Sequence, residues 1–486
     1  MQDYAQRLSA GLLFSMTSFF KTALLLLALS LQAMAQEDTV STTLNAPLPV
    51  EGSGEVAHWG VRFQGRAGKV LVMDEYQRRW QKDKNMSNYD LQFVHTWLPS
   101  DSDAFAKDFN YPNLTIGLRY DNYHNVSTHR EKDPAWGLLE PVDYDSYMSD
   151  MFTLYGKFER PLLRTKHWLV DYQLGTGVGY CTKKYNTTDC IDNELIGSHL
   201  NIFFTAGVTA TYRVARDWGF TTGIEFAHHS NGALARPNKG VNTLAPLIGV
   251  TYCPYYEAQL PPSDLTPPDL PTGEEQDTRN SRNLRNIQNA RVDRKNRNFR
   301  PYWYANIDLG IGGKTLLEDW LYTQFSTPPG EADYRTEKFN TYFACALSAH
   351  AMYRYQRRWA SGLGIDVFHA SYSNREAQID DKYGHTGAKH SPWSIGISAH
   401  HEVFFGRLSV PMTLGYYLFR EMGEKAKQNE KRYYERIGVR YRPFGKKNEH
   451  SQGWECFTSG IAFGFNINAH ATKADYTEFV VSVPIF

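Results

Sequence analysis

Apolar residues alternate with small or polar residues along many short stretches of this 486-residue chain. The clearest stretch places four apolar side chains at every second position: Ile461, Phe463, Phe465 and Ile467. Small or polar residues fill the positions between and after them: Ala462, Gly464, Asn466 and Asn468. Successive side chains of a β-strand point to opposite faces, so this pattern predicts a strand with one apolar face.

The same alternation predicts a series of strands on either side of a Pro- and Arg-rich break. Eight segments precede the break, at 57–72, 91–98, 113–123, 149–160, 166–180, 199–213, 217–230 and 241–253. About eight follow it, at 302–312, 340–355, 358–373, 393–406, 408–419, 431–443, 457–469 and 475–486. Short alternating segments separated by turns predict an all-β fold.

The apolar rows of these segments indicate a wall that faces lipid. The chain has 31 Tyr and 11 Trp, and those at strand ends resemble the aromatic girdles of membrane interfaces, which a soluble β-sandwich does not need. We therefore expect an antiparallel transmembrane β-barrel, built as two eight-stranded barrels or as one larger barrel. The strand count before the break favours two units, whereas the single aromatic terminus at Phe486 favours one assembly event.

The segments divide the chain into five expected regions. Residues 1–35 are expected to be a signal peptide, because a short apolar core precedes a small-x-small cleavage motif that ends at Ala35. The other expected regions are a polar tether at 36–55, a first barrel region at 56–255, a polar linker at 256–300 and a C-terminal barrel region at 301–486. No later stretch approaches about 18 consecutive apolar residues, so no transmembrane helix is predicted.

Charge and cysteine content narrow the possible partners. The 52 Lys and Arg residues balance the 52 Asp and Glu residues, which indicates no nucleic-acid partner. Cys181 and Cys190 flank a short polar loop, where an exported chain can form a disulfide. Cys253, Cys345 and Cys456 lie in apolar segments and are expected to be buried or lipid-facing. The cysteines lack the spacing of metal ligands, and no metal or cofactor is predicted.

Polar side chains end the apolar row of the segment 217–230. His228 and Ser230 lie on that row, and Asn242 begins the apolar row of the next strand. Membrane barrels start and end in the periplasm, and 217–230 is the seventh strand. We therefore expect these three side chains on the lipid side of the outer rim. His229 and Glu225 occupy the opposite row and are expected to face the lumen. A histidine beside a serine is a possible base and nucleophile.

The site also carries a family resemblance. His228-His229-Ser230-Asn231-Gly232, followed by Pro237-Asn238-Lys239-Gly240, resembles the paired motifs of the PagL-like lipid A 3-O-deacylases, also called the acyloxyacyl hydrolase-like barrels. The resemblance covers about 57–255, with weaker support from Tyr111-Pro112 and Gly117. It implies an eight-stranded outer-membrane barrel of a Gram-negative bacterium. Such a barrel hydrolyses an acyl ester of lipid A or lipopolysaccharide without a cofactor.

The resemblance implies a role for each residue of the site. Ser230 resembles the family nucleophile, His228 the base and Asn231 the residue that helps to form the oxyanion hole. The family orients its histidine with a glutamate, and the matching position here is Asn242. An asparagine can hold an imidazole by a hydrogen bond but cannot stabilise an imidazolium by charge. This departure puts the rate of hydrolysis, and the activity itself, in question.

Two other functions stay open at this point. The chain could be a non-enzymatic outer-membrane barrel, porin-like or structural, that keeps a degenerate site. It could also be an adhesion barrel that acts through long loops such as 123–148 and 374–392. An ungapped internal echo places His369 and Ser371 where the first copy has His228 and Ser230. The echo lacks the Pro-Asn-x-Gly element, so a second site is not predicted there.

Overall fold

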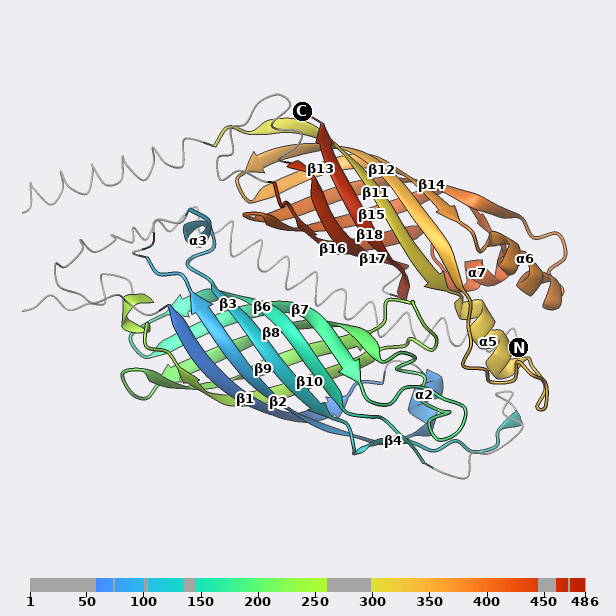
Figure 1. Ribbon diagram of the computed structural model, residues 1–486, viewed down its shortest axis with the longest axis horizontal. Coiled ribbons are helices and arrows are strands. Elements are labelled where there is room, and N and C mark those ends of the chain that lie inside the picture. The colour runs from blue at the N-terminus through green and yellow to red at the C-terminus, as the bar shows by residue number, and fades with distance from the viewer. Residues whose placement is uncertain are drawn as a thin grey trace, which may run out of the picture.

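The computed structural model describes residues 58–72, 75–99, 101, 104–134, 145–259, 299–444, 460–470 and 473–485. Within them the chain forms two closed antiparallel barrels of eight strands each, called here the N-terminal barrel and the C-terminal barrel (Figure 1). The alternative of one larger barrel is therefore wrong. The expected signal peptide and tether, most of the expected linker, Cys456 and Phe486 lie outside the described residues.

The N-terminal barrel closes where β1 pairs with both β10 and β2. Its strands are β1 (Trp59–Val70), β2 (Gln81–Thr96), β3 (Asn113–Asn122), β6 (Met151–Arg164), β7 (Trp168–Cys181), β8 (Leu200–Arg213), β9 (Trp218–Ser230) and β10 (Val241–Tyr252). Shorter elements lie at its two ends: α2 (Glu75–Trp80), α3 (Ala104–Asp108), β4 (Val126–Thr128), β5 (Ser146–Tyr147) and the 3-10 helix η2 (Glu257–Gln259).

The C-terminal barrel pairs its strands in chain order, and β18 closes on β11. Its strands are β11 (Tyr302–Thr315), β12 (Thr341–Gln356), β13 (Trp359–Ala370), β14 (His390–Phe405), β15 (Leu408–Met422), β16 (Tyr433–Tyr441), β17 (Ala462–His470) and β18 (Lys473–Ile485). Three helices gather at one end: α5 (Leu317–Phe325), α6 (Ser373–Lys382) and α7 (Gly423–Asn429). No helix in the described parts of the chain is long and apolar enough to cross a membrane.

Two local differences from the sequence expectations have physical reasons. β2 begins at Gln81 rather than at residue 91, because its first part pairs with β1 and β4 and needs no apolar row. The backbone hydrogen bonds of the two neighbouring strands hold this polar part extended. The segment 374–392, expected to be a long loop, contains most of α6. That helix buries Ile379 in a small apolar cluster at the end of the C-terminal barrel.

Both barrels turn apolar side chains outward and charged side chains inward. On β9, Phe220 is 60% exposed, whereas Glu225 on the opposite face is 3% exposed. Inside the N-terminal barrel an Arg66 nitrogen lies 2.8 Å from a Glu225 oxygen. Inside the C-terminal barrel Arg436 lies 2.5 Å from Glu478. Buried charges need such partners, and side chains fill the interior of a barrel of this size.

The disulfide expected between Cys181 and Cys190 is absent, and both side chains are buried free thiols. Cys181 Sγ lies 2.9 Å from Ser149 Oγ and donates to the Lys183 carbonyl at 2.6 Å. Cys190 Sγ donates to the Tyr147 carbonyl at 3.4 Å. Each thiol therefore has its own acceptor, and the expectation was wrong because spacing along a loop does not fix where side chains point.

Most of the helices and long loops lie at one end of each barrel, and most of the connections at the other end are shorter. β9 and β11 both finish at the end where α5, α6 and α7 lie (Figure 1). The turns at the opposite end are short, as between β8 and β9 or between β12 and β13. Outer-membrane barrels have short periplasmic turns and longer extracellular loops. The end with α5, α6 and α7 is therefore taken as the outer end.

The two barrels lie side by side and touch at both ends (Figure 1). At the inner end, the rings of Phe109 and Phe405 stack with their centroids 4.9 Å apart. At the outer end, Tyr185 of the β7–β8 loop donates a hydrogen bond of 2.8 Å to the Arg335 carbonyl. The ring of Tyr185 also packs edge-on against Trp320 of α5, with centroids 5.0 Å apart. The barrels therefore share one orientation in the membrane.

Candidate active site

His228 and Asn242 meet at the outer end of the N-terminal barrel. The antiparallel register of β9 and β10 places them directly opposite each other. His228 Nδ1 and Asn242 Oδ1 lie 2.8 Å apart, within hydrogen-bond distance. Ser230 ends β9 two residues beyond His228, on the same face of the strand. The three side chains that the sequence placed on one outer rim thus occupy neighbouring positions there.

Apolar side chains of β8 flank this face of β9. The register pairs Phe204 with His228 and Ile202 with Ser230. Both apolar side chains are half-buried, and Ile224 farther down β9 is 51% exposed. The polar rim therefore sits directly above a lipid-facing apolar wall, an arrangement suited to a substrate with a polar head and an acyl chain.

The loop 231–240 shapes the other side of the site. The Asn231 backbone N–H donates to Asn238 Oδ1 at 2.9 Å, and the Ala235 N–H donates to Asn231 Oδ1 at 3.3 Å. These bonds fix the Asn231 side chain and leave its Nδ2 group buried with no hydrogen-bond partner among the described residues. Gly240, at φ +74°, lies so close to the His228 ring that a Cβ there would clash with it. The amide of Asn231 is thus a positioned donor without an acceptor.

The two polar residues of the opposite row belong to the barrel interior. His229 is 1% exposed, and its Nε2 lies 3.0 Å from Thr153 Oγ1. Glu225 is held by Arg66 and Arg119, whose nitrogens lie 2.8 and 2.5 Å from its two oxygens. Neither side chain can reach the outer face, so Glu225 does not replace the acid that Asn242 lacks.

The internal echo in the C-terminal barrel lacks these partners. His369 of β13 pairs with Cys345 on one side and Trp393 on the other. Its ring packs edge-on against Trp393, with centroids 4.8 Å apart. Neither neighbour offers the amide oxygen that Asn242 gives to His228.

Sequence reasoning missed the residues that surround the 231–240 loop. Asn238 belongs to the Pro-Asn-x-Gly motif, but the motif alone does not indicate that its side chain accepts a hydrogen bond from the Asn231 backbone N–H. Thr315 and Thr477 of the C-terminal barrel also bond to this loop. They lie about 80 and 240 residues away along the chain, and no local signal marks either one.

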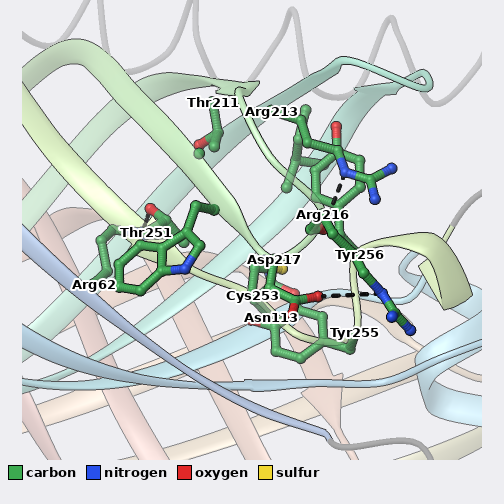
Figure 2. Close-up of a pocket in the computed structure, with 13 residues that line it drawn as sticks. Arg62, Asn113, Thr211, Arg213, Arg216, Asp217, Thr251, Cys253, Tyr255 and Tyr256 are labelled. Carbon is green, nitrogen blue, oxygen red and sulfur yellow. Dashed lines mark hydrogen bonds and ion pairs between the residues drawn. The ribbon is translucent and has the colours of Figure 1, made fainter.

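A small pocket lies at the opposite end of the N-terminal barrel (Figure 2). Its lining includes Trp218 at the start of β9, and also Arg213, Asp217 and Tyr255. Ser230 is at the other end of the same strand, about 40 Å away at 3.3 Å per residue. The pocket is therefore separate from the candidate site.

One group of side chains has the spacing of a metal site. Ligand atoms of Glu430, His470 and Asp475 all lie within 4.8 Å of one another at the outer end of the C-terminal barrel. Lys314 Nζ lies 2.7 Å from Glu430 and also pairs with Asp475, and Arg420 pairs with Glu430. These carboxylates are already neutralised by side-chain cations, so the group does not fit a divalent cation.

Two family models match the chain, one on each barrel. The model described as lipid A 3-O-deacylase (PagL) matches residues 107–251. The N-terminal barrel is thus PagL-like. The model described as the C-terminal domain of acyloxyacyl hydrolase (PagL_C) matches residues 303–485. The chain is therefore a PagL-like outer-membrane β-barrel protein. Its second barrel matches a separate family model, that of the acyloxyacyl hydrolase C-terminal domain. No match was found among curated proteins.

Solved outer-membrane barrels also resemble parts of the chain. The outer-membrane enzyme PagL shares 14% identity and covers 39% of this chain and 97% of its own, with a TM-score of 0.24. Ail from Yersinia pestis shares 11% identity and covers 40% and 99%, with a TM-score of 0.22. OccK8 from Pseudomonas aeruginosa shares 9% identity and covers 89% and 99%, with a TM-score of 0.19. Likeness at this level says nothing about the activity of the chain.

Proposed function

We propose that this protein is a lipid A deacylase of a Gram-negative outer membrane, which cleaves an acyl ester of lipid A or of a related lipid in the outer leaflet. The observation that carries the proposal is the hydrogen bond between His228 and Asn242 beside Ser230, on an apolar wall at the outer rim. The match of residues 107–251 to the lipid A 3-O-deacylase model supports this substrate class.

The proposed reaction begins with attack on the ester. Ser230 Oγ attacks the carbonyl carbon while His228 Nε2 takes the hydroxyl proton. The negative charge moves to the carbonyl oxygen, where Asn231 Nδ2 donates a hydrogen bond. The ester C–O bond then breaks, and the proton passes from His228 to the departing sugar oxygen. Water attacks the acyl-enzyme with His228 again as the base, releasing the fatty acid and restoring Ser230.

Asn242 sets the protonation pattern of the base in this scheme. Its Oδ1 accepts a hydrogen bond from His228 Nδ1–H, which leaves Nε2 without a proton and ready to accept one. Asn242 carries no charge, so it does not add an ionic contribution once His228 is protonated. We infer a working but slow deacylase.

The interiors of the barrels bear on the alternative of a porin-like protein. Buried ion pairs such as Arg62–Glu159, at 2.8 Å, occupy the N-terminal lumen. The C-terminal lumen holds the pair of Arg436 with Asp366, at 3.3 Å. Side chains thus fill both lumens, which favours an enzyme at the rim over an open channel.

Mass spectrometry of lipid A tests the proposal. The full chain is expressed in a Gram-negative outer membrane beside Ser230→Ala, His228→Ala and the matched control Ser371→Ala from the internal echo. We expect lipid A to lose one acyl mass with the wild type and the control, and to stay intact with the two site variants. Intact lipid A with a folded wild-type protein would rule out the proposed reaction on this lipid.

A further inference from the structure

The C-terminal barrel bonds directly to the loop that carries the candidate oxyanion donor. Thr477 Oγ1 of β18 donates to the Gly232 carbonyl at 3.0 Å. At the end of β11, Thr315 donates twice to the Ala233 carbonyl, from its backbone N–H at 2.9 Å and from its Oγ1 at 2.8 Å. These three bonds fall on the two residues that follow Asn231.

The backbone at these two residues is in a conformation that needs support. Gly232 has a φ of +61° and Ala233 a φ of +66°. An alanine rarely adopts this left-handed region, so the surrounding contacts must hold it there. A Cβ at Gly232 would clash with Thr477 Oγ1, and it would come into contact with Ile202 of β8. The C-terminal barrel therefore packs closely against the turn.

A buried arginine also joins the same loop to the C-terminal barrel. Arg236 is 7% exposed, and its guanidinium donates to the Thr315 carbonyl from Nε at 3.0 Å and from Nη2 at 2.7 Å. Four carboxylates of the C-terminal barrel act on it electrostatically: those of Glu318, Asp475, Glu430 and Glu376. The loop thus places a buried cation near these carboxylates, and its two hydrogen bonds to the Thr315 carbonyl fix how the loop meets the second barrel.

We propose that the C-terminal barrel is a positioning element for catalysis, with Thr477 and Thr315 as positioning residues that hold Asn231 where the oxyanion forms. This inference rests on the proposed deacylase function. Neither threonine touches the substrate. Their hydroxyls donate hydrogen bonds to the Gly232 and Ala233 carbonyls and so hold the turn. The turn then positions the Asn231 side chain, whose Oδ1 accepts a hydrogen bond from the Ala235 N–H.

The size of the expected effect follows from the role of the donor. Loss of an oxyanion-hole donor lowers kcat by about 10² to 10³, and a misplacement of about 1 Å costs up to about 10². We therefore expect Thr315→Val/Thr477→Val to lower kcat by roughly 10- to 100-fold and to leave KM within about twofold. Val matches the shape of Thr without the hydroxyl. Thr477→Ser keeps the hydroxyl, so Thr315→Val/Thr477→Ser should recover much of the kcat that Thr315→Val/Thr477→Val loses.

The inner end of the interface supplies a matched control. Arg358 donates to the Asp108 carbonyl and joins the barrels far from the site. Arg358→Ala should weaken this inner contact and leave kcat unchanged. A kcat that falls equally in Arg358→Ala would overturn the proposal, because any loss of barrel contact would then suffice. An unchanged kcat in the folded double-Val variant would overturn it as well.

Hydrogen exchange of the full-length proteins separates this proposal from the proposed function. Amides of residues 231–240 should exchange faster in the double-Val variant than in the wild type and in Arg358→Ala. If the wild type does not deacylate lipid A, the deacylase proposal fails, and exchange alone then decides whether the C-terminal barrel holds the turn. Equal exchange rates in all three proteins would overturn the positioning role in either case.

Discussion

His228 and Asn242 face each other across the β9–β10 pair, and their side chains are joined by a hydrogen bond of 2.8 Å between Nδ1 and Oδ1. An acid at the position of Asn242 would orient the imidazole in the same way and would also stabilise its protonated form. In the proposed Ser/His site, Asn242 thus orients the imidazole without the charge that an acid would add.

Restoring that charge should accelerate the reaction. In a Ser-His-Asp triad, exchange of the acid for its amide lowers kcat by about 10⁴. We expect Asn242→Glu to raise kcat by about tenfold or more, and Asn242→Leu to lower it because the imidazole loses its orienting bond. Steady-state deacylation of lipid A in detergent micelles measures both. A folded Glu variant with an equal or lower kcat would contradict the assigned role.

Asn231 gives a second test of the chemistry. Its buried Nδ2 has no acceptor among the described residues, while its Oδ1 accepts from the Ala235 N–H. Asn231→Asp keeps the acceptor and removes the donor, so kcat should fall by about 10² to 10³ at a nearly constant KM. An increase in KM with an unchanged kcat would instead assign Asn231 to ground-state binding.

A buried carboxyl on α6 predicts how stability depends on pH. Burial raises the pKa of Glu376 well above its usual value of 4.5, and Glu318 adds to the shift. Both Glu376 oxygens lack a hydrogen-bond partner within the described parts of the chain. The folded state thus binds the proton more tightly than the unfolded state, so stability is lost as the pH rises from 4.5 toward the raised pKa.

Glu376→Gln should remove this loss. We expect its thermal midpoint in detergent to exceed that of the wild type at pH 8 and to equal it at pH 4. Each 1 kcal/mol is worth about 2–4 °C in a domain of this size. The exposed Glu424 of α7 serves as a control, because its side chain is 48% exposed and Glu424→Gln should shift neither midpoint. A midpoint of Glu376→Gln that falls at pH 8 would refute the account.

The free thiols of the β7–β8 loop are directly measurable. Burial raises the pKa of Cys190 to about 11, so little thiolate exists at pH 8 and alkylation of the native protein should be slow. After denaturation without a reductant, both Cys181 and Cys190 should be alkylated, as peptide mass spectrometry can count. Recovery of the two cysteines as a linked, unalkylated pair would show that the disulfide forms after all.

Most of the fold could be predicted because the signal is local. A wall in lipid forces an apolar residue at every second position, and this pattern located every strand of both barrels. The first part of β2, from Gln81, lacks that pattern because its neighbours β1 and β4 hold it. The helix α6 was not predicted for a related reason, because its contacts at the end of the barrel stabilise it.

Part of the candidate site could likewise be predicted from the sequence, and part could not. His228, Ser230 and Asn242 could be placed together because strand periodicity and the count of strands fix their face and their end of the barrel. The hydrogen bond of Thr477 to Gly232 spans about 240 residues and depends on how two separate barrels dock. No pattern along the chain contains that information, and the same holds for the burial of Arg236 beneath the second barrel.

Lipids reach a membrane enzyme by lateral diffusion, so the plane of the bilayer is the whole space from which substrate arrives. The C-terminal barrel lies against the loop beside Ser230 and closes one sector of that plane. The wall of β10 and β1 stays open, with Ile248 72% and Phe63 55% exposed. For the proposed deacylase, this wall is the open approach next to His228 and Asn242. The rate of substrate capture would then depend on which other molecules occupy the bilayer beside β10 and β1.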